Sequence, residues 1–359
     1  MTMALARSSS SLLAEALAGS WRATATPLEI SVAELEMLTP LLLGSGAGGL
    51  GWWRVRQSEA LRETESGKQL LDAYRLLALQ DVVHQNNIKQ LFMLLRSADV
   101  EPLLAKGWTI ARRYPEAALR PYGDMDICVR PEQYRRAEDV LKSPEGKQLN
   151  IDLHKGFSEI QDRSINELFA RSQLVPLDEV DVRLMGAEDH LGLLTIHLLK
   201  HGGWRPLWLC DIGAALETRP AGFDWDVCLG QDTRRASWIL SAIGLAHQLL
   251  GAKIDDTPVA GRAKLLPKWL VPNVLKQWET PFAINQSPMR HSAPMASYLR
   301  NPRGLLADLR KRWPDPITAT ISLEGSFNNW PRLPYQLGNC LARASQFFRQ
   351  LSSRLREQQ

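Results

Sequence analysis

The chain has 359 residues, enough for about two or three domains that each bury a core. Hydrophobic residues make up 45% and charged residues 23%, a balance that excludes a wholly disordered, collagenous or membrane-embedded protein. The formal net charge is +4, from 43 basic and 39 acidic residues, which is too small to indicate a general nucleic-acid-binding protein.

The cysteine pattern bears on the redox compartment. Four cysteines are scattered along the chain without a Cys-x-x-Cys pair: Cys128, Cys210, Cys228 and Cys340. Neither a disulfide framework nor a cysteine-ligated zinc site is therefore indicated. We expect a cytoplasmic protein, because the apolar stretch at residues 12–18 contains Glu15 and lacks the preceding basic cluster of a signal peptide.

A second apolar stretch, residues 38–53, contains Pro40 and five glycines among its 16 residues. A membrane-spanning helix needs about 20 apolar residues, so this stretch predicts no transmembrane segment. We interpret it as a buried loop between helices.

The first hundred residues are expected to be helical, because apolar residues recur every three or four positions over 31–43 and 59–96. From about residue 99 to 184, short apolar runs predict strands at 100–105, 124–129 and 149–153. Helical segments at 108–114 and 132–141 separate these runs, which indicates a small mixed α/β unit.

After Gly186 the helical period returns. It predicts a helix that ends at Gly202 and Gly203, then helices at 207–217 and 233–250, and further helices joined by loops that contain Pro267, Pro272, Pro288, Pro294 and Pro302. We therefore expect an α+β fold with three parts: an N-terminal helical region (1–98), an α/β core (99–185) and a C-terminal helical region with a basic tail (186–359).

The sharpest chemical feature is a pair of aspartates two positions apart, Asp124 and Asp126. On a strand, side chains alternate between the faces, so the two carboxylates would project from one side. A third carboxylate, Asp152, lies in the next strand-like run and shares its face with His154. Carboxylates on adjacent strands can hold two divalent ions ~3.5–4 Å apart, the arrangement that serves in-line displacement at phosphorus.

A glycine turn precedes these carboxylates. The strand-like run at 101–105 leads into Lys106 and Gly107 and then into a helix, where backbone N–H groups could receive a phosphate.

Several motifs in this order resemble the DNA polymerase beta-like nucleotidyltransferase superfamily, and most closely its uncharacterised nucleotidyltransferase family from bacterial biosynthetic gene clusters. The resembling stretches are LLAKG (103–107), LRPYGDMDICV (119–129), IDLH (151–154), HLLKH (197–201) and LWLCDIGAAL (207–216). The resemblance covers about residues 34–225.

The resemblance implies that Asp124 and Asp126 bind Mg²⁺ (or Mn²⁺) and a nucleoside triphosphate, and that Asp152 completes the two-metal site and helps to activate the acceptor. It places Gly107 and Gly123 beside the nucleotide. The sequence departs from the family pattern where Trp108 follows Gly107 in place of Ser or Gly. Lys106 or Arg120 is therefore a second candidate for holding the phosphates, the alternative for both being surface pairing with Glu101 or Glu116.

His197 and His201 have the i, i+4 spacing of a metal-binding pair, but no glutamate lies in the HLLKH run, so the sequence disfavours a zinc-protease site. We interpret them as a helical wall beside the active site that binds Asp211 or substrate, or alternatively as core histidines. His154 is a further candidate for contact with the acceptor. The tryptophans, Trp204 and Trp208 among them, are assigned to helix packing.

These features predict a metal-dependent nucleotidyltransferase that transfers a nucleoside monophosphate to a small molecule, peptide or protein. A decayed nucleotide-binding or scaffold protein, or a toxin-like enzyme that acts on RNA, is the alternative. Nucleic acid is disfavoured because residues 1–299 hold 33 basic and 35 acidic side chains. Residues 300–359 hold ten basic and four acidic ones, and the amphipathic helix expected at 335–356 is where an anionic partner would bind.

Overall fold

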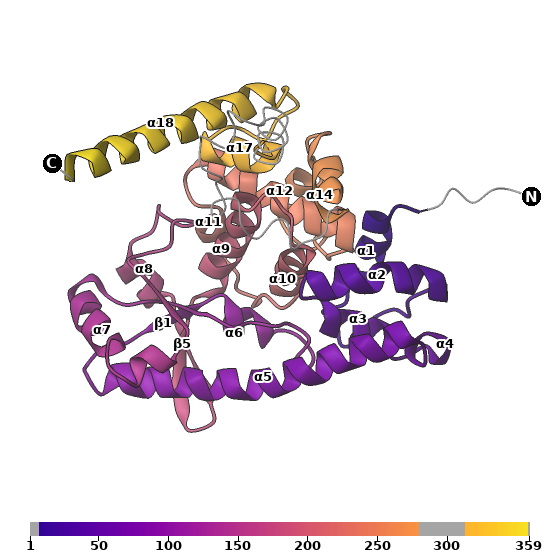
Figure 1. Ribbon diagram of the computed structural model, residues 1–359, viewed down its shortest axis with the longest axis horizontal. Helices are drawn as coiled ribbons and strands as arrows, with labels where there is room; N and C mark the ends of the chain where they lie inside the picture. The colour runs from indigo at the N-terminus through magenta and orange to yellow at the C-terminus, as the bar shows by residue number, and fades with distance from the viewer. Residues whose placement is uncertain (1–6, 280–312, 358–359) are drawn as a thin grey trace, which may run out of the picture.

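Figure 1 shows a computed structural model of the chain, in which residues 7–279 and 313–357 are described, with side chains as far as residue 345. The N-terminal part is helical, as expected: α1 (Ser9–Leu17), α2 (Val32–Gly44), α3 (Gly48–Val55), α4 (Glu59–Arg62) and α5 (Glu65–Arg96). A capping box between Ser31 and Glu34 begins α2, and the Thr64 hydroxyl caps the long helix α5.

The prediction of a loop at residues 38–53 is wrong, because most of this stretch belongs to α2 and α3. Pro40 lies inside α2, and only residues 45–47 separate the two helices. The glycines serve close packing here: a Cβ at Gly49 would lie 2.4 Å from the backbone oxygen of Ala118. Glycine in this segment therefore permits a close contact between backbones instead of a loop.

A five-stranded mixed sheet follows, in the order β3-β2-β1-β5-β4. Its strands are β1 (Leu103–Ala105), β2 (Met125–Cys128), β3 (Ile151–His154), β4 (Gln173–Leu177) and β5 (Val180–Leu184). β2 is antiparallel to β1 and parallel to β3, while β5 is parallel to β1 and antiparallel to β4. The first three strands confirm the prediction from the apolar runs. The β4–β5 hairpin was not predicted, and Pro176 within β4 is a residue that disfavours a strand.

The two faces of the sheet have different coverings. Leu104, Met125 and Ile127 pack with apolar residues of α5 and of α7 (Tyr134–Leu141). The opposite face carries Ala105 and Cys128, which pack against α8 (Ile165–Ala170) and α9 (Ala187–Lys200). Shorter elements lie between the strands: α6 (Gly107–Ala111) and the 3₁₀ turns η1 (Pro131–Gln133) and η2 (Gly146–Gln148).

The C-terminal part is again helical. After α9 come α10 (Pro206–Glu217), α11 (Trp225–Leu229), α12 (Thr233–Leu250), α13 (Ala260–Ala263), α14 (Leu270–Trp278), α17 (Pro316–Ser322) and α18 (Leu333–Glu357). The predicted helices at 207–217, 233–250 and 335–356 are confirmed. Pro267 lies in the loop before α14 as predicted, but Pro272 lies in the first turn of α14, where a proline is tolerated. Pro288, Pro294 and Pro302 lie outside the described residues.

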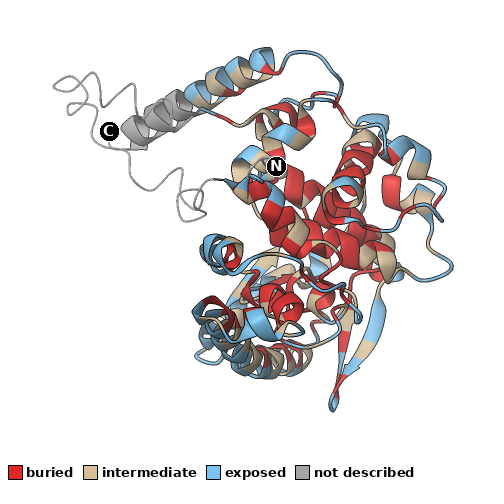
Figure 2. Cartoon of the chain, turned by 90° about the vertical axis from the view of Figure 1, so that its right-hand side faces the viewer, coloured by how far each residue is buried: buried red, intermediate tan, exposed pale blue. Residues whose placement is uncertain are grey.

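The largest hydrophobic core joins both helical parts. It runs from Leu12 in α1 to Phe327 after α17, and Figure 2 shows its buried residues gathered in the packed helices. The α+β class is thus confirmed, while the domain boundaries at 98 and 185 stay predictions.

The terminal helix α18 exposes Leu333, Leu337 and Leu341. Its side chains beyond residue 345 are not described, so an anionic partner for this helix stays a prediction. Among the described residues, no helix combines the length and apolarity that crossing a bilayer requires.

Candidate active site

The register of the central strands gathers acidic side chains on one face. Asp126 of β2 pairs with Asp152 of β3 on one side and with Ala105 of β1 on the other. Because paired residues project to the same face, both carboxylates and His154, two positions after Asp152, lie on the face that α8 and α9 cover. The predicted sharing of a face by Asp152 and His154 agrees with this register.

Asp126 is the buried member, only 6% exposed. Its Oδ1 lies 3.0 Å from Lys106 Nζ and 3.0 Å from His154 Nε2. Burial acts to raise the pKa of the Asp126 carboxyl, but the hydrogen bond with His154 and the charge of Lys106 outweigh it and lower that pKa. Asp126 is therefore held as a carboxylate between two basic groups.

Asp126, Asp152 and His154 form a potential metal-binding group, in which one ligand atom from each residue lies within 4.8 Å of the others. No other such group of three is found within the described parts of the chain. The donor chemistry fits a divalent ion, since carboxylate oxygens suit Mg²⁺ and Mn²⁺ and an imidazole extends the set to transition metals. Asp124 precedes β2, is exposed, and lies outside this group.

An open cleft of about 410 Å³ lies over these carboxylates. It is lined by nine of the predicted site residues: Lys106, Gly107, Arg120, Gly123, Asp124, Asp126, Asp152, His197 and His201. His154 is not among the lining residues but bonds to Asp126, which is. The structure thus brings residues from distant parts of the sequence to one cleft; their roles in binding stay predictions.

The turn after β1 has a left-handed backbone, with φ of +53° at Lys106 and +39° at Gly107. Such angles favour glycine, so Lys106 occupies a strained position. The following helix, α6, has five residues, too few for a substantial helix dipole, so the positive group at this turn is the Lys106 ammonium. Gly123 has an ordinary φ, and a Cβ there would meet no atom within 4 Å.

Arg120 is buried, and its guanidinium makes a bidentate ion pair with Asp211 of α10 at 2.7 and 3.1 Å. The Tyr114 hydroxyl donates to the same carboxylate at 2.8 Å. The alternative interpretation, in which Arg120 and Lys106 pair with Glu101 or Glu116 at the surface, is therefore wrong. Lys106 pairs with Asp126, and Arg120 pairs with Asp211. Those glutamates are bound by other residues: Arg96 and Arg183 for Glu101, and Arg56 and Tyr74 for Glu116.

The segment at 120–124 is held at further points. The Tyr122 hydroxyl donates to Asp81 of α5 at 2.8 Å, and the Asn150 side chain donates to the Gly123 carbonyl at 3.2 Å. Arg120 and Tyr122 therefore tie the loop that carries Asp124 to α10 and to α5.

The far wall of the cleft is aromatic. The Trp208 ring centroid lies 4.6 Å from that of His197 and 5.1 Å from that of His201. The expected bond from these histidines to Asp211 is not what the structure shows, since His197 Nδ1 lies 3.3 Å from Oε1 of Glu159. Burial is the main cause that lowers the pKa of His201 to about 4, so it is neutral at pH 7.

Sequence reasoning missed three groups at this wall. Trp208 was assigned to packing, and Arg205 and Glu159 were not considered; no local pattern marks either of them. Arg205 lines the cleft, with its guanidinium 5.5 Å from the Trp208 ring centroid. Burial and the charge of Arg120 lower the pKa of Arg205 to about 10, which leaves it cationic at pH 7.

Comparison with protein families now adds to this geometry. Residues 52–251, more than half of the chain, match the family model described as uncharacterised nucleotidyltransferase. The chain belongs to this family. No curated protein and no solved structure matches it significantly. The matched residues contain the whole cleft, from Lys106 to Trp208, which agrees with the resemblance drawn from the motifs.

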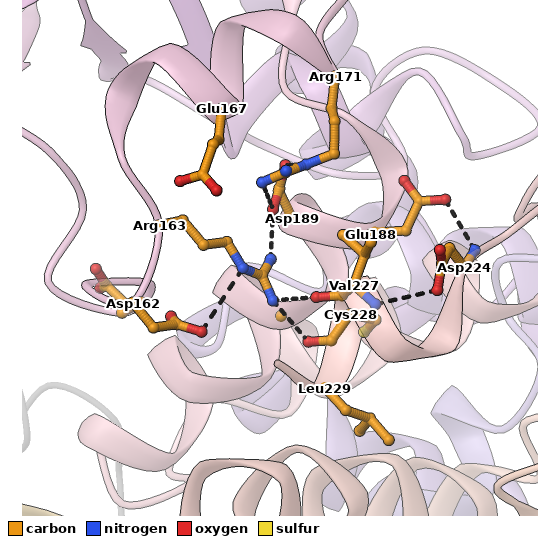
Figure 3. Close-up of polar contacts among 12 residues, drawn as sticks. Asp162, Arg163, Glu167, Arg171, Glu188, Asp189, Asp224, Val227, Cys228 and Leu229 are labelled. Atoms are coloured by element: carbon orange, nitrogen blue, oxygen red, sulfur yellow. Dashed lines mark hydrogen bonds and ion pairs between the residues drawn. The ribbon is translucent and has the colours of Figure 1, made fainter. Parts of the chain in front are cut away.

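A buried ion cluster ties the segment around α8 to α9 and α11 (Figure 3). Asp189, in the first turn of α9, is fully buried and accepts hydrogen bonds from Arg163 and Arg171, which flank α8. The Arg163 guanidinium also donates to the backbone oxygens of Val227 and Cys228 in α11. The segment before α8, the start of α9 and α11 are thereby tied together.

Proposed function

We propose that this chain is a metal-dependent nucleotidyltransferase that moves a nucleoside monophosphate from a nucleoside triphosphate to an acceptor and releases pyrophosphate. The observation that supports this most is the group of Asp126, Asp152 and His154 on adjacent parallel strands below an open cleft. The family match supports the reaction class.

Asp126 and Asp152 would hold a divalent ion, Mg²⁺ or Mn²⁺, with Asp124 from the cleft rim and His154 as further donors. When bound, such an ion polarises phosphoryl oxygens and offsets the charge of the leaving pyrophosphate. Lys106 now neutralises Asp126 at 3.0 Å. Since its ammonium can rotate on a long stem, Lys106 would turn toward the triphosphate as the cation that contacts its oxygens.

Arg205 of the Arg205–Trp208 pair supplies a second cation that lines the cleft. Its planar guanidinium suits bidentate contact with a phosphate group. Arg120 is committed to Asp211, so we assign it to holding the 120–124 loop in place and not to the phosphates. Gly107 and Gly123 would let the backbone approach the nucleotide.

The proposed acceptor is a small molecule, a peptide or a protein side chain, with nucleic acid disfavoured by the balanced charge of residues 1–299. The proposed location is the cytoplasm, which fits the buried, unpaired thiols of Cys128, Cys210 and Cys228.

The test is a pyrophosphate-release assay with each of the four ribonucleoside triphosphates, Mg²⁺ or Mn²⁺, and a panel of hydroxyl and amine acceptors. Binding of a non-hydrolysable triphosphate with the ion is measured in parallel by calorimetry. Asp126→Asn and Asp152→Asn should each lower metal-dependent turnover by about 10²-fold or more, because each removes an ion ligand worth several kcal/mol.

Asp181→Asn is the matched control, since Asp181 is an exposed aspartate on β5 of the same sheet and does not line the cleft. Asp152 has a side chain that is 62% exposed, so its substitution should not prevent folding. Metal-dependent triphosphate binding that is unchanged in both Asp126→Asn and Asp152→Asn would refute the assigned site.

A further inference from the structure

His197 and Glu159 form a carboxylate–histidine pair at the cleft. His197 lies on α9 and lines the cleft, and Glu159 lies on the segment between β3 and α8. His197 Nδ1 is 3.3 Å from Glu159 Oε1, and the two side chains are 18% and 10% exposed. The pair therefore sits between the protein interior and the cleft that holds the three aspartates.

The charge state of Glu159 determines which ring nitrogen carries the proton. Burial acts to raise the pKa of Glu159, but the hydrogen bond with His197 and the charges of Lys106 and Lys200 outweigh it and lower that pKa to about 2. An ionised carboxylate can only accept a hydrogen bond, so Nδ1 of His197 must be the donor. In the neutral ring, Nε2 is then left as a proton acceptor for a group in the cleft.

Glu159 is held in position by several contacts of its own segment. Lys200 Nζ donates to the Ser158 carbonyl at 2.7 Å, and Arg235 Nε donates to the Glu159 carbonyl at 3.3 Å. A few residues further on, the Arg163 guanidinium binds Asp189 of α9 (Figure 3). The segment that carries Glu159 and the helix that carries His197 are thus joined at two ends, which preorganises the pair.

The imidazole ring is also oriented from its other side. The Trp208 ring meets it edge-on, at an interplanar angle of 72° and a centroid distance of 4.6 Å, and the His201 ring lies at 4.6 Å. A ring fixed by a carboxylate at Nδ1 and by aromatic neighbours resembles the base of a catalytic triad in its arrangement.

From this geometry we propose that His197 is the general base that deprotonates the acceptor and that Glu159 is its positioning residue. This inference rests on the proposed function. His197 Nε2 takes the proton of an acceptor O–H, the acceptor oxygen forms a bond to the α-phosphorus, and the bond from that phosphorus to the bridging oxygen of the β-phosphate breaks. Pyrophosphate leaves with the bonding electrons, and the imidazolium beside Glu159 later returns its proton to water.

The acceptor class follows from this assignment. A base is useful where the acceptor proton must be removed, as for an alcohol or a water molecule, and it is not needed for an acceptor that is already an anion. The charged and titratable groups around the pair are Lys200 and His201 from α9, Lys106 from the turn after β1, Arg205 from α10 and Arg235 from α12. We therefore propose an alcohol acceptor.

The activity test uses the full chain, the four ribonucleoside triphosphates with Mg²⁺, and water and glycerol as acceptors. His197→Ala and His197→Gln should lower pyrophosphate release by about 10²–10⁴-fold while binding of a non-hydrolysable triphosphate changes little. Added imidazole should restore part of the rate of His197→Ala, which a merely structural histidine would not show. His247→Ala is the control, because His247 lies on α12, bonds to the backbone oxygen of Ala252 just after that helix, and does not line the cleft.

Glu159 has a separate readout. In protein labelled with ¹⁵N-histidine, the long-range ¹H–¹⁵N spectrum should show His197 protonated at Nδ1 and not at Nε2, at a pH about two units above the ordinary imidazole pKa. Glu159→Gln should slow turnover and weaken the preference for the Nδ1-protonated form of His197. Glu159→Asp should retain more activity than Glu159→Gln.

The outcomes separate the two hypotheses. A wild-type protein that releases no pyrophosphate from any triphosphate overturns the proposed function. Turnover at the wild-type rate in His197→Ala overturns only the assignment of His197 as the general base. A spectrum in which His197 is protonated at Nε2 overturns the same assignment. Loss of turnover with rescue by imidazole supports it.

Discussion

The ion pair between Arg120 and Asp211 is the contact through which the helical region most directly supports the active-site loop, and Asp211→Asn tests its strength. Asp211 is 0% exposed and accepts from Arg120 Nε, Arg120 Nη2 and the Tyr114 hydroxyl. An asparagine removes the charge and turns an NH₂ group toward the guanidinium. Breaking a buried pair in this way costs about 3–5 kcal/mol, because one charge stays buried and uncompensated.

Urea unfolding followed by tryptophan fluorescence measures this loss of the free energy of unfolding. At ~2–4 °C per kcal/mol for a chain of several hundred residues, the melting temperature should fall by about 6–20 °C. Tyr114→Phe is the graded control: it removes one hydrogen bond to a charged group and should cost about 1.5–3 kcal/mol.

A double variant separates charge from packing. Combining Arg120→Met with Asp211→Leu removes both charges, so it should be less destabilising than either single substitution. If Asp211→Asn unfolds within about 1 kcal/mol of the wild type, the pair is not isolated from water and the reasoning from burial is wrong.

Three further predictions concern stability away from the cleft. Gly49→Ala should lower the free energy of unfolding, measured by urea titration, by about 1–3 kcal/mol, because the new Cβ would lie 2.4 Å from the Ala118 carbonyl oxygen. Gly261→Ala is the control: its Cβ would meet no atom within 4 Å, so the same titration should show no loss of stability. Burial lowers the pKa of His190 to about 3 from the ordinary 6.5. As the pH falls from 6.5 toward 3, the unfolded chain therefore binds a proton at this histidine that the folded chain does not bind. The free energy of unfolding then falls by up to ~1.4 kcal/mol per pH unit. His190→Leu should flatten that slope in unfolding curves recorded across this pH range, and an unchanged slope would contradict the assignment. Ser31→Ala removes the capping box of α2 and should cost about 1 kcal/mol, seen as a lower urea midpoint; no change would show that the cap is frayed in solution.

Local patterns were sufficient to predict the long helices α5, α10 and α12 and the three central strands, but not α3. α12 begins after the Asp232 cap and ends at Gly251 in a left-handed conformation, and both signals are visible in the sequence. The β4–β5 hairpin was missed because its turn consists of Asp178 and Glu179, which lack the usual glycine, although Asp178 adopts a φ of +50°.

For the site, alternation along β3 was enough to place Asp152 and His154 on one face. The partners of the basic residues were not predictable in the same way. Arg120 lies 91 residues from Asp211 and His197 lies 38 residues from Glu159, so only the packing of α9 and α10 against the sheet brings these groups together. Charge and spacing in the sequence carry no information about which ionic side chain is buried.

The shared helical core has a consequence for synthesis of the chain. Ser10 in α1 donates a hydrogen bond to Glu279, 269 residues later, and α1 packs against α12 and α14. At ~5–20 residues per second, a ribosome needs roughly 10–50 s to make the intervening chain. For that time the surface of α1 that packs against α12 and α14 lacks these two partners, although α2 and α3 already contact other parts of α1. The amino-terminal segment therefore depends on late-made helices for its burial, and a stalled or truncated chain should expose an aggregation-prone surface.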